Sequence, residues 1–278
     1  VENGLEKLIS EDGGKSLVCS NNYDIAISDT NVTYILTATP SKSDGSFSNE
    51  QIESALESLS LVLKKSTKKN HLFVISSTVM PGSIQNTFIP LIEKISGRVL
   101  NKGFQIAYCP DFVAIGEVIK GFLNPEFVVI GQSCKEAGDI VSDIHHNITE
   151  NNPPLKTMSL ASAEIAKVSL NAYITMKISF ANNLANICEQ VPNSDVDDIT
   201  SAIGLDKRIS PFFFKAGMSY GGTCFPRDTF AFNNLSNNVG LSTNLFDAVS
   251  DINDYQDNHL ADLVLKELDG LTLAQIHT

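Results

Sequence analysis

A glycine-rich loop from Tyr220 to Asp228 contains one cysteine in the order Tyr-Gly-Gly-Thr-Cys-Phe-Pro-Arg-Asp. Its two adjacent glycines allow the backbone to pass close to a ligand. Pro226 suits the first position of a helix, which puts Cys224 just before a helix N-terminus, where the thiolate is favoured. Asp228 then falls in the first turn, within reach of the sulfur. The loop indicates a nucleophilic cysteine, and a buried structural cysteine beside a turn is an equally supported alternative.

The most apolar long segment, from Leu160 to Cys188, contains one glutamate, two lysines and several asparagines. The candidates among them are Glu164, Lys167 and Asn171. Lys167 and Asn171 are four residues apart and therefore share a helix face. A lysine within an apolar helix is costly unless it has a partner or a role. An ammonium and an amide on one face can hold an oxyanion. For these residues alone, a lysine that reaches the surface or pairs with Glu164 is the favoured interpretation.

A third group of candidates follows two predicted strands. Ser76 to Gly82 reads Ser-Ser-Thr-Val-Met-Pro-Gly, and Pro110-Asp111-Phe112 follows the next strand. Ligands bind at the carboxyl ends of parallel strands in open α/β sheets. Thr78 can therefore position a water or contact a cofactor there, although a helix N-cap is the commoner role for such a residue.

The elements that position these residues follow from the hydrophobic pattern. Short apolar runs predict strands at 32–39, 71–77, 105–109 and 127–131, and helical spacing predicts helices at 51–69, 82–95 and 133–144. This alternation predicts an α/β fold with a doubly wound parallel sheet. After Asn151-Asn152-Pro153-Pro154 the pattern becomes helical, with a long helix at about 162–190 and helical spacing over 230–265.

Composition limits the classes of partner. The 278-residue chain is 42% hydrophobic and 19% charged, so it is long and apolar enough to build a core. A formal charge of −12 excludes nucleic acid and anionic membranes as expected partners, because both require a basic face. The five cysteines form no CxxC pair, and no leader or ordinary membrane span is apparent, which predicts a reducing, cytoplasmic location. No GxGxxG and no zinc-type histidine spacing occur.

Four motifs together resemble the UDP-glucose/GDP-mannose dehydrogenase family over nearly the whole chain. They are Thr37-Ala38-Thr39-Pro40, Ser77-Thr78-Val79-Met80-Pro81-Gly82, Ala163-Glu164-Ile165-Ala166-Lys167 with Asn171, and Gly221-Gly222-Thr223-Cys224-Phe225-Pro226-Arg227-Asp228. The stretch 206–216 is most similar to the UDP-glucose 6-dehydrogenase branch. The resemblance implies a partial Rossmann-like NAD-binding domain at 1–154, a helical dimerisation domain with a long core helix at 155–262, and the start of a linker at 263–278.

The resemblance also implies an NAD-dependent, four-electron oxidation of a sugar C6 alcohol to a carboxylate, most simply UDP-glucose to UDP-glucuronate. Cys224 is expected to form a thiohemiacetal and then a thioester, Lys167 and Asn171 to stabilise oxyanions, Asp228 to help activate the hydrolytic water, and Thr78 to hold a water nearby. The implied NAD contacts are Thr39, Pro40, Ser77, Thr78 and Arg227. The implied nucleotide-sugar contacts are Asp111, Phe112, Lys167, Asn171, Phe213, Lys215, Tyr220, Gly221 and, from a neighbouring subunit of a homodimer, Arg208.

The chain departs from the family pattern in three places. The first Rossmann strand with its glycine-rich turn is expected before Val1, and a nucleotide-binding domain is expected after Thr278, so this chain alone is expected to be inactive. Ile115 stands where the family has a second acidic residue, and Glu117 is out of register. UDP-N-acetylmannosamine and GDP-mannose therefore remain alternative substrates. The same residues are also compatible with a two-electron β-hydroxyacid-type dehydrogenase and with a non-catalytic dimerisation module.

Overall fold

The computed structural model describes residues 4–113 and 116–268, and it divides the chain into two compact units at 1–167 and 168–278. The first unit contains a five-stranded sheet, and the second is helical. One continuous helix, α7 (Leu160–Cys188), contributes residues to both. Of the linker predicted at 263–278, residues 263–268 are helical and belong to α10 (Asn244–Leu268), and the rest lies outside the described residues. The predicted acidic-site position Ile115 also lies outside them.

The sheet has the strand order β1-β2-β3-β4-β5. The strands are β1 (Val32–Ile35), β2 (Leu72–Ile75), β3 (Gln105–Tyr108), β4 (Val128–Gln132) and β5 (Leu155–Ser159). The predicted α/β class is confirmed, with β1, β2 and β3 parallel. The expectation that every strand runs parallel is wrong, because β4 pairs antiparallel with β3 and β5 runs parallel to β4. An apolar run predicts burial and carries no information about strand direction.

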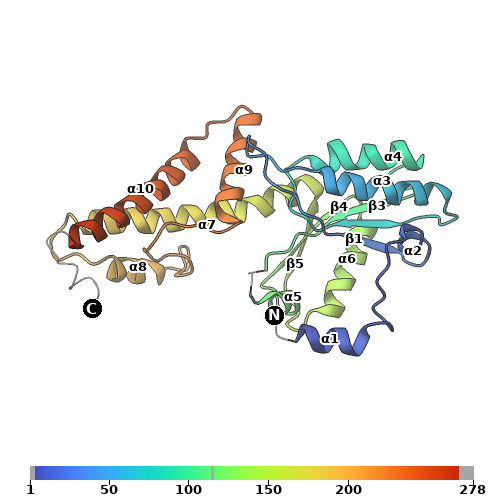
Figure 1. Cartoon of the computed structure of the whole chain (residues 1–278), viewed down its shortest axis with the longest axis horizontal. Helices are drawn as coiled ribbons and strands as arrows, with labels where there is room; N and C mark the ends of the chain where they lie inside the picture. The colour runs from blue at the N-terminus through green and yellow to red at the C-terminus, as the bar shows by residue number, and fades with distance from the viewer. Residues whose placement is uncertain (1–3, 114–115, 269–278) are drawn as a thin grey trace. The chain divides into compact units, whose positions relative to one another are not determined.

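Helices cover both faces of this sheet (Figure 1). On one face, α3 (Glu50–Lys65) and α4 (Ile89–Ser96) pack against alternate strand residues such as Phe73 and Ile106. On the other face, α6 (Lys135–Ile148) packs against the intervening residues, including Val74 and Ala107. The period-two alternation of strand side chains thus divides the core into two apolar layers. Three shorter helices complete the described part of the unit: α1 (Leu5–Asp12), α2 (Tyr23–Ser28) and α5 (Val118–Leu123).

The helix predicted from 82 to 95 begins as a π-helical turn, η1 (Ile84–Phe88), and continues as α4. Pro90 lies in the first turn of α4, where its missing N–H removes one hydrogen bond of the α-helical ladder. A wider turn before a proline is a common local adjustment of a helix.

The start of α7 lies unusually close to the sheet. A Cβ added at Gly131 of β4 would meet Ala163 Cβ at 2.8 Å and Leu160 Cα at 3.1 Å. Leu160 and Ala163 are both buried there. Because glycine lacks a side chain, the first turns of α7 lie directly on the β4 backbone.

The second unit is built from α7, α8 (Val196–Gly204), α9 (Phe225–Asn238) and α10 (Asn244–Leu268). The long helix predicted at 162–190 is confirmed. The helical spacing over 230–265 is interrupted, because Gly240 adopts a left-handed φ of 74° and ends the α9 region. Among residues 4–113 and 116–268, no helix is both long and apolar enough to span a membrane.

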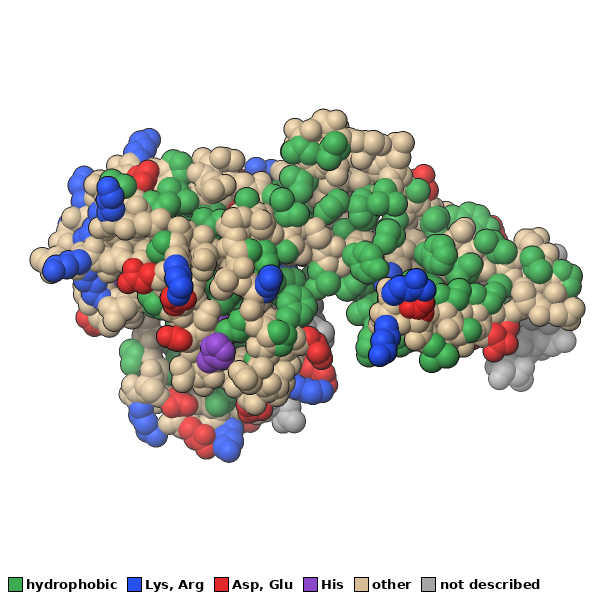
Figure 2. All heavy atoms as spheres, turned by 180° about the vertical axis from the view of Figure 1, so that it is seen from behind, with side chains coloured by type: hydrophobic (Ala, Val, Ile, Leu, Met, Phe, Trp, Pro, Cys, Tyr) green, Lys and Arg blue, Asp and Glu red, His purple; other side chains and the backbone are tan. Residues whose placement is uncertain are grey.

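Apolar side chains are gathered on the surface of the helical unit (Figure 2). On α7, Tyr173, Phe180 and Ile187 recur every seven residues and are each about half exposed. Seven-residue spacing places them in one stripe along the helix. Large exposed apolar patches on soluble proteins mark interaction surfaces.

Candidate active-site residues

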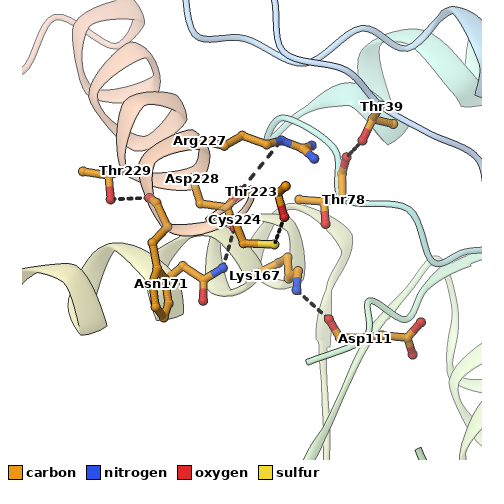
Figure 3. A network of polar contacts seen from close by, with 11 residues as sticks. Thr39, Thr78, Asp111, Lys167, Asn171, Thr223, Cys224, Arg227, Asp228 and Thr229 are labelled. Carbon is orange, nitrogen blue, oxygen red and sulfur yellow. Dashed lines mark hydrogen bonds and ion pairs between the residues drawn. The ribbon is translucent and has the colours of Figure 1, made fainter. Parts of the chain in front are cut away.

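Cys224 occupies the N-cap position of α9, as its sequence context predicts. Pro226 lies within the first two helical positions, and the Asp228 N–H donates to the Cys224 carbonyl oxygen at 2.8 Å. The sulfur is exposed and lies 3.6 Å from Thr223 Oγ1 (Figure 3). The preceding Gly222 has a φ of 79°, a conformation that favours glycine. An accessible thiol is therefore presented at a helix N-terminus, where the helix dipole favours negative charge.

Asn171 and Asp228 join the long helix to the turn that carries the cysteine. Asn171 Nδ2 donates to Asp228 Oδ2 at 2.6 Å, and the Asp228 residue is 4% exposed (Figure 3). The Nε of Arg227, a predicted NAD contact, lies 4.0 Å from Asp228 Oδ1. Hydrogen bonds to a buried carboxylate are stronger than those between neutral groups. The structure therefore brings two predicted catalytic residues into direct contact within the second unit.

In the first unit, Lys167 contacts the segment that follows β3. Its Nζ donates to the Asp111 carbonyl oxygen at 2.5 Å and lies 4.6 Å from the centre of the Phe112 ring (Figure 3). Burial raises the pKa of the Asp111 carboxyl, and the nearby Lys167 opposes that shift. Three predicted substrate contacts therefore lie together around one ammonium group.

Glu164 has a positioning role that its sequence context did not reveal. The side chain is fully buried, and its oxygens accept from the backbone N–H groups of Gly82 at 2.7 Å and Ile84 at 3.0 Å. Burial raises the pKa of this carboxyl, and these two hydrogen bonds oppose the shift. The carboxylate thereby fixes the segment that carries Thr78. Thr78 itself is no helix N-cap, because the next helix begins at Ile84 with Ser83 in that position.

The predicted NAD contacts of the first unit lie at the carboxyl ends of β1 and β2. Ser77 Oγ accepts from the Thr37 N–H at 2.7 Å and donates to the Thr37 carbonyl oxygen at 2.8 Å. Thr39 Oγ1 donates to the Thr78 carbonyl oxygen at 2.7 Å, and Pro40 is exposed beyond it. These bonds join the two strand ends where a dinucleotide lies in this type of sheet.

Part of this edge fits a dinucleotide. Thr37 Oγ1 is buried without a partner among the described residues, and the neighbouring Leu36 exposes 63% of an apolar side chain. An unpaired hydroxyl beside an exposed apolar surface suits the ribose and ring of such a ligand. The hydrogen bonds at Thr39, Ser77 and Thr78 shape the backbone of this edge, so these residues fit a place beside the dinucleotide. Within the described residues, no cluster of three or more metal-ligating side chains occurs.

The loop before Cys224 carries the remaining predicted sugar contacts. Arg208 is exposed and forms an ion pair with Asp206 at 2.6 Å. The Phe213 ring meets the Phe225 ring edge-on, with 6.2 Å between ring centres. Lys215 and Gly221 are exposed, and Tyr220 is 8% exposed, which raises the pKa of its phenol. The structure thus brings Phe213 to the residue next to Cys224 and leaves Arg208 and Lys215 on the surface of this unit.

Three buried amides that sequence reasoning missed hold the same loop. Asn182 accepts from the Gly217 N–H at 2.9 Å, and Gln256 donates to the Gly217 carbonyl oxygen at 2.9 Å. Asn253 binds both the N–H and the carbonyl oxygen of Tyr220, at 2.7 and 3.1 Å. An amide within an otherwise apolar helical stripe was the available signal, because a buried amide requires hydrogen-bond partners.

Comparison with known proteins agrees with this fold. Residues 1–149 match the NAD-binding domain of the UDP-glucose/GDP-mannose dehydrogenase family, and residues 161–255 match its central domain. The chain belongs to this family, a family of NAD-dependent nucleotide-sugar dehydrogenases.

Individual relatives carry related names. UDP-glucose 6-dehydrogenase AglM of Haloferax volcanii is 35% identical over 277 residues, which are 98% of this chain and 64% of that protein. UDP-glucose 6-dehydrogenase of Rickettsia bellii is 33% identical over 89% of this chain and 54% of that protein. The structure of a UDP-glucose dehydrogenase from Pyrobaculum islandicum matches with a TM-score of 0.86 and 30% identity, over 98% of this chain and 61% of the other. The chain therefore spans 54–64% of the length of these relatives.

Proposed function

We propose that the protein oxidises the C6 alcohol of a nucleotide sugar to a carboxylate, with UDP-glucose as the expected substrate and UDP-glucuronate as the product. The observation that carries this proposal is the exposed Cys224 at a helix N-terminus whose first turn contains Asp228, the hydrogen-bond partner of Asn171. The names of relatives at 33–35% identity support the choice of UDP-glucose. The site residues are assigned from these contacts together with the family motifs.

Each residue has a role that matches its chemistry. The Cys224 sulfur adds to the aldehyde carbon formed by the first oxidation; the thiol gives up its proton, and the former aldehyde oxygen takes one up as its double bond to carbon breaks, which gives a thiohemiacetal. The second oxidation turns this into a thioester, and water displaces the sulfur to release the carboxylate. NAD, when bound, supplies the hydride acceptor for both oxidations. Because the sugar stays on the sulfur, the reactive intermediate is not released between the two steps.

Lys167 and Asn171 are proposed to stabilise the oxyanions. They lie one turn apart on α7, so one helix presents both an ammonium and an amide N–H. Asp228 accepts a hydrogen bond from Asn171 and is proposed to orient the hydrolytic water. Thr78 is proposed to hold a water nearby, and Arg208, Phe213, Lys215, Tyr220 and Gly221 to contact the nucleotide sugar.

We also propose that the protein acts as a cytoplasmic homodimer that associates through its helical unit. The exposed stripe of Tyr173, Phe180 and Ile187 supports an interface along α7. Light scattering on the protein should give twice the chain mass, and Tyr173→Glu with Ile187→Glu should give the chain mass. A wild-type monomer would contradict the dimer.

Product stoichiometry tests the reaction. The assay uses the protein as encoded, with any residues that precede Val1 or follow Thr278. With UDP-glucose limiting, we expect two NADH per sugar and an acyl adduct on Cys224 in acid-quenched samples. UDP-N-acetylmannosamine and GDP-mannose, run in parallel, decide the substrate. One NADH per sugar with a fully active Cys224→Ala variant would identify a two-electron enzyme and contradict the proposal.

A further inference from the structure

Lys177 of α7 binds three backbone carbonyl groups of the loop that precedes Cys224. Its Nζ donates to the carbonyl oxygens of Ile209 at 3.0 Å, Ser210 at 3.1 Å and Phe212 at 2.6 Å. A lysine ammonium has three N–H donors, and these three acceptors use all of them. We call this group the Lys177 clamp. Partial burial of the ammonium lowers the pKa of Lys177.

The loop needs such an anchor because its backbone is strained. Ser210 has a φ of 68° and Phe213 a φ of 57°. A left-handed conformation is unusual for residues other than glycine, and a bulky aromatic side chain disfavours it further. It persists only where neighbouring contacts hold it. Ser210 is itself one of the three acceptors, and Phe213 follows the last of them. Three carbonyl dipoles that converge repel one another, and a cation between them offsets this repulsion.

The clamped segment leads directly to the nucleophile. The Phe213 ring contacts Phe225, which follows Cys224 in the chain. The next residue, Phe214, is 5% exposed and lies 5.8 Å from Lys177 Nζ and 6.0 Å from the stacked Phe180 ring. The ammonium thus fixes the backbone before Phe213 and packs against the ring after it. Contacts on both sides of Phe213 therefore hold its backbone in place.

We propose that Lys177 is a positioning residue that holds residues 209–213 so that Phe213 forms a fixed apolar wall beside Cys224. This inference rests on the proposed function, because it assigns that wall to binding of the nucleotide sugar. Lys177 does not touch the reacting atoms. Its loss weakens sugar-nucleotide binding and leaves the oxidation steps nearly unchanged.

Proteolysis tests the clamp independently of activity. Lys207 and Arg208 are exposed trypsin sites at the start of the loop. Cleavage of a locally opened segment follows the population of its open form, so Lys177→Met should accelerate cleavage after these residues by about tenfold or more. Lys177→Arg, which keeps the charge and several donors, should cleave at nearly the wild-type rate. Lys266→Met, at an exposed lysine of α10, is the matched control. Equal cleavage of wild type and Lys177→Met in the protein as encoded would overturn the clamp.

Kinetics of the protein as encoded test its functional role. Lys177→Met should raise KM for the nucleotide sugar by about tenfold and change kcat by less than about threefold, with rescue by Lys177→Arg. If Lys177→Met does not fold, Lys177→Gln, which keeps two donors, provides the same comparison. A fall in kcat with an unchanged KM would overturn the positioning role. If the wild type oxidises no nucleotide sugar, the proposed function fails, and the proteolysis comparison still decides whether Lys177 holds the loop.

Discussion

The side-chain amide of Asn171 lies 2.6 Å from a carboxylate oxygen of Asp228, and this contact links α7 to the first turn of α9. The pair is directional, since the amide donates and the carboxylate accepts. Its residues come from positions 57 apart in the chain. Both stability and chemistry should depend on which of the two side chains carries the charge.

Exchanging the two side chains separates the contribution of the pair to stability from its contribution to the chemistry. Asn171→Asp places two carboxylates within hydrogen-bond distance and should lower the free energy of unfolding by about 2–3 kcal/mol. Adding Asp228→Asn restores an amide–carboxylate pair and should recover most of that loss, as measured by urea denaturation at neutral pH. The exchanged protein should remain inactive, because its negative charge has moved. A double variant as unstable as the sum of the single variants would contradict the paired geometry.

Thiol accessibility gives a prediction that needs no substrate. Cys224 and Cys19 are exposed, whereas Cys109 is buried beside His145 at 3.2 Å. Burial raises the pKa of the Cys109 thiol to about 12, so its thiolate is roughly a thousandfold scarcer than that of an ordinary cysteine. Iodoacetamide should therefore modify Cys224 and Cys19 well before Cys109, as followed by peptide mass spectrometry.

The activity of the protein as encoded should disappear in step with modification of Cys224. A Cys19→Ser variant is the matched control and should lose activity at the same rate. Bound nucleotide sugar should slow the loss. Full modification of Cys224 with full retention of activity would exclude it as the nucleophile.

Replacing Lys167 should slow the reaction more than it weakens binding. Its proposed partner is a negative charge that develops during the oxidation, so Lys167→Ala should lower kcat by about 10²–10³. The Kd for the nucleotide sugar should change by less than about fivefold, measured by calorimetry, because ground-state contacts remain. Lys156→Ala, at an exposed lysine of β5, should behave as wild type. Equal losses of rate and affinity would assign Lys167 to binding alone.

Acid should destabilise the sheet-containing unit through His71. The residue is 1% exposed, its Nε2 lies 2.8 Å from Thr33 Oγ1, and burial lowers the pKa of the imidazole to about 4. The unfolded chain takes up this proton near pH 6.5, so stability is fully present above that pH and is lost as the pH falls toward 4. The loss should approach about 3 kcal/mol.

His71→Gln keeps a polar atom near Thr33 and does not titrate in this range. Urea unfolding at pH 7 and pH 4 should therefore show a smaller pH-dependent loss in this variant than in wild type. Identical losses in the two proteins would mean that other groups determine acid sensitivity.

Local signals in the sequence predicted the elements with the strongest patterns. The apolar composition of 162–190 predicted α7, and Pro226 predicted that Cys224 precedes a helix. The direction of strands and the interruption of helices were harder to predict. The apolar run at Val128–Ile130 is compatible with either strand direction, and β5 was missed because Leu155–Ser159 is mostly polar and follows two prolines. Gly240 ends a helix through its backbone conformation, which an otherwise helical spacing conceals.

The candidate site was likewise predictable only where its residues belong to local motifs. The resemblance to family motifs predicted roles for Cys224, Lys167, Asn171 and Asp228, because each belongs to a local motif. The partners of Glu164 and Lys177 are backbone groups distant in the chain, at Gly82 and at Ile209. Any residue has a backbone N–H and carbonyl group, so no residue type marks such a partner.

The absence of a methyl group at position 131 has an effect beyond local packing. Alanine there would force the opening turns of α7 outward by several tenths of an ångström, and the rigid helix would carry Glu164 and Lys167 with it. The lack of a side chain at residue 131 therefore determines how close Glu164 and Lys167 lie to the sheet, although Gly131 touches neither of them. A substitution at residue 131 would therefore shift the side chains of Glu164 and Lys167 together, without a change of either residue.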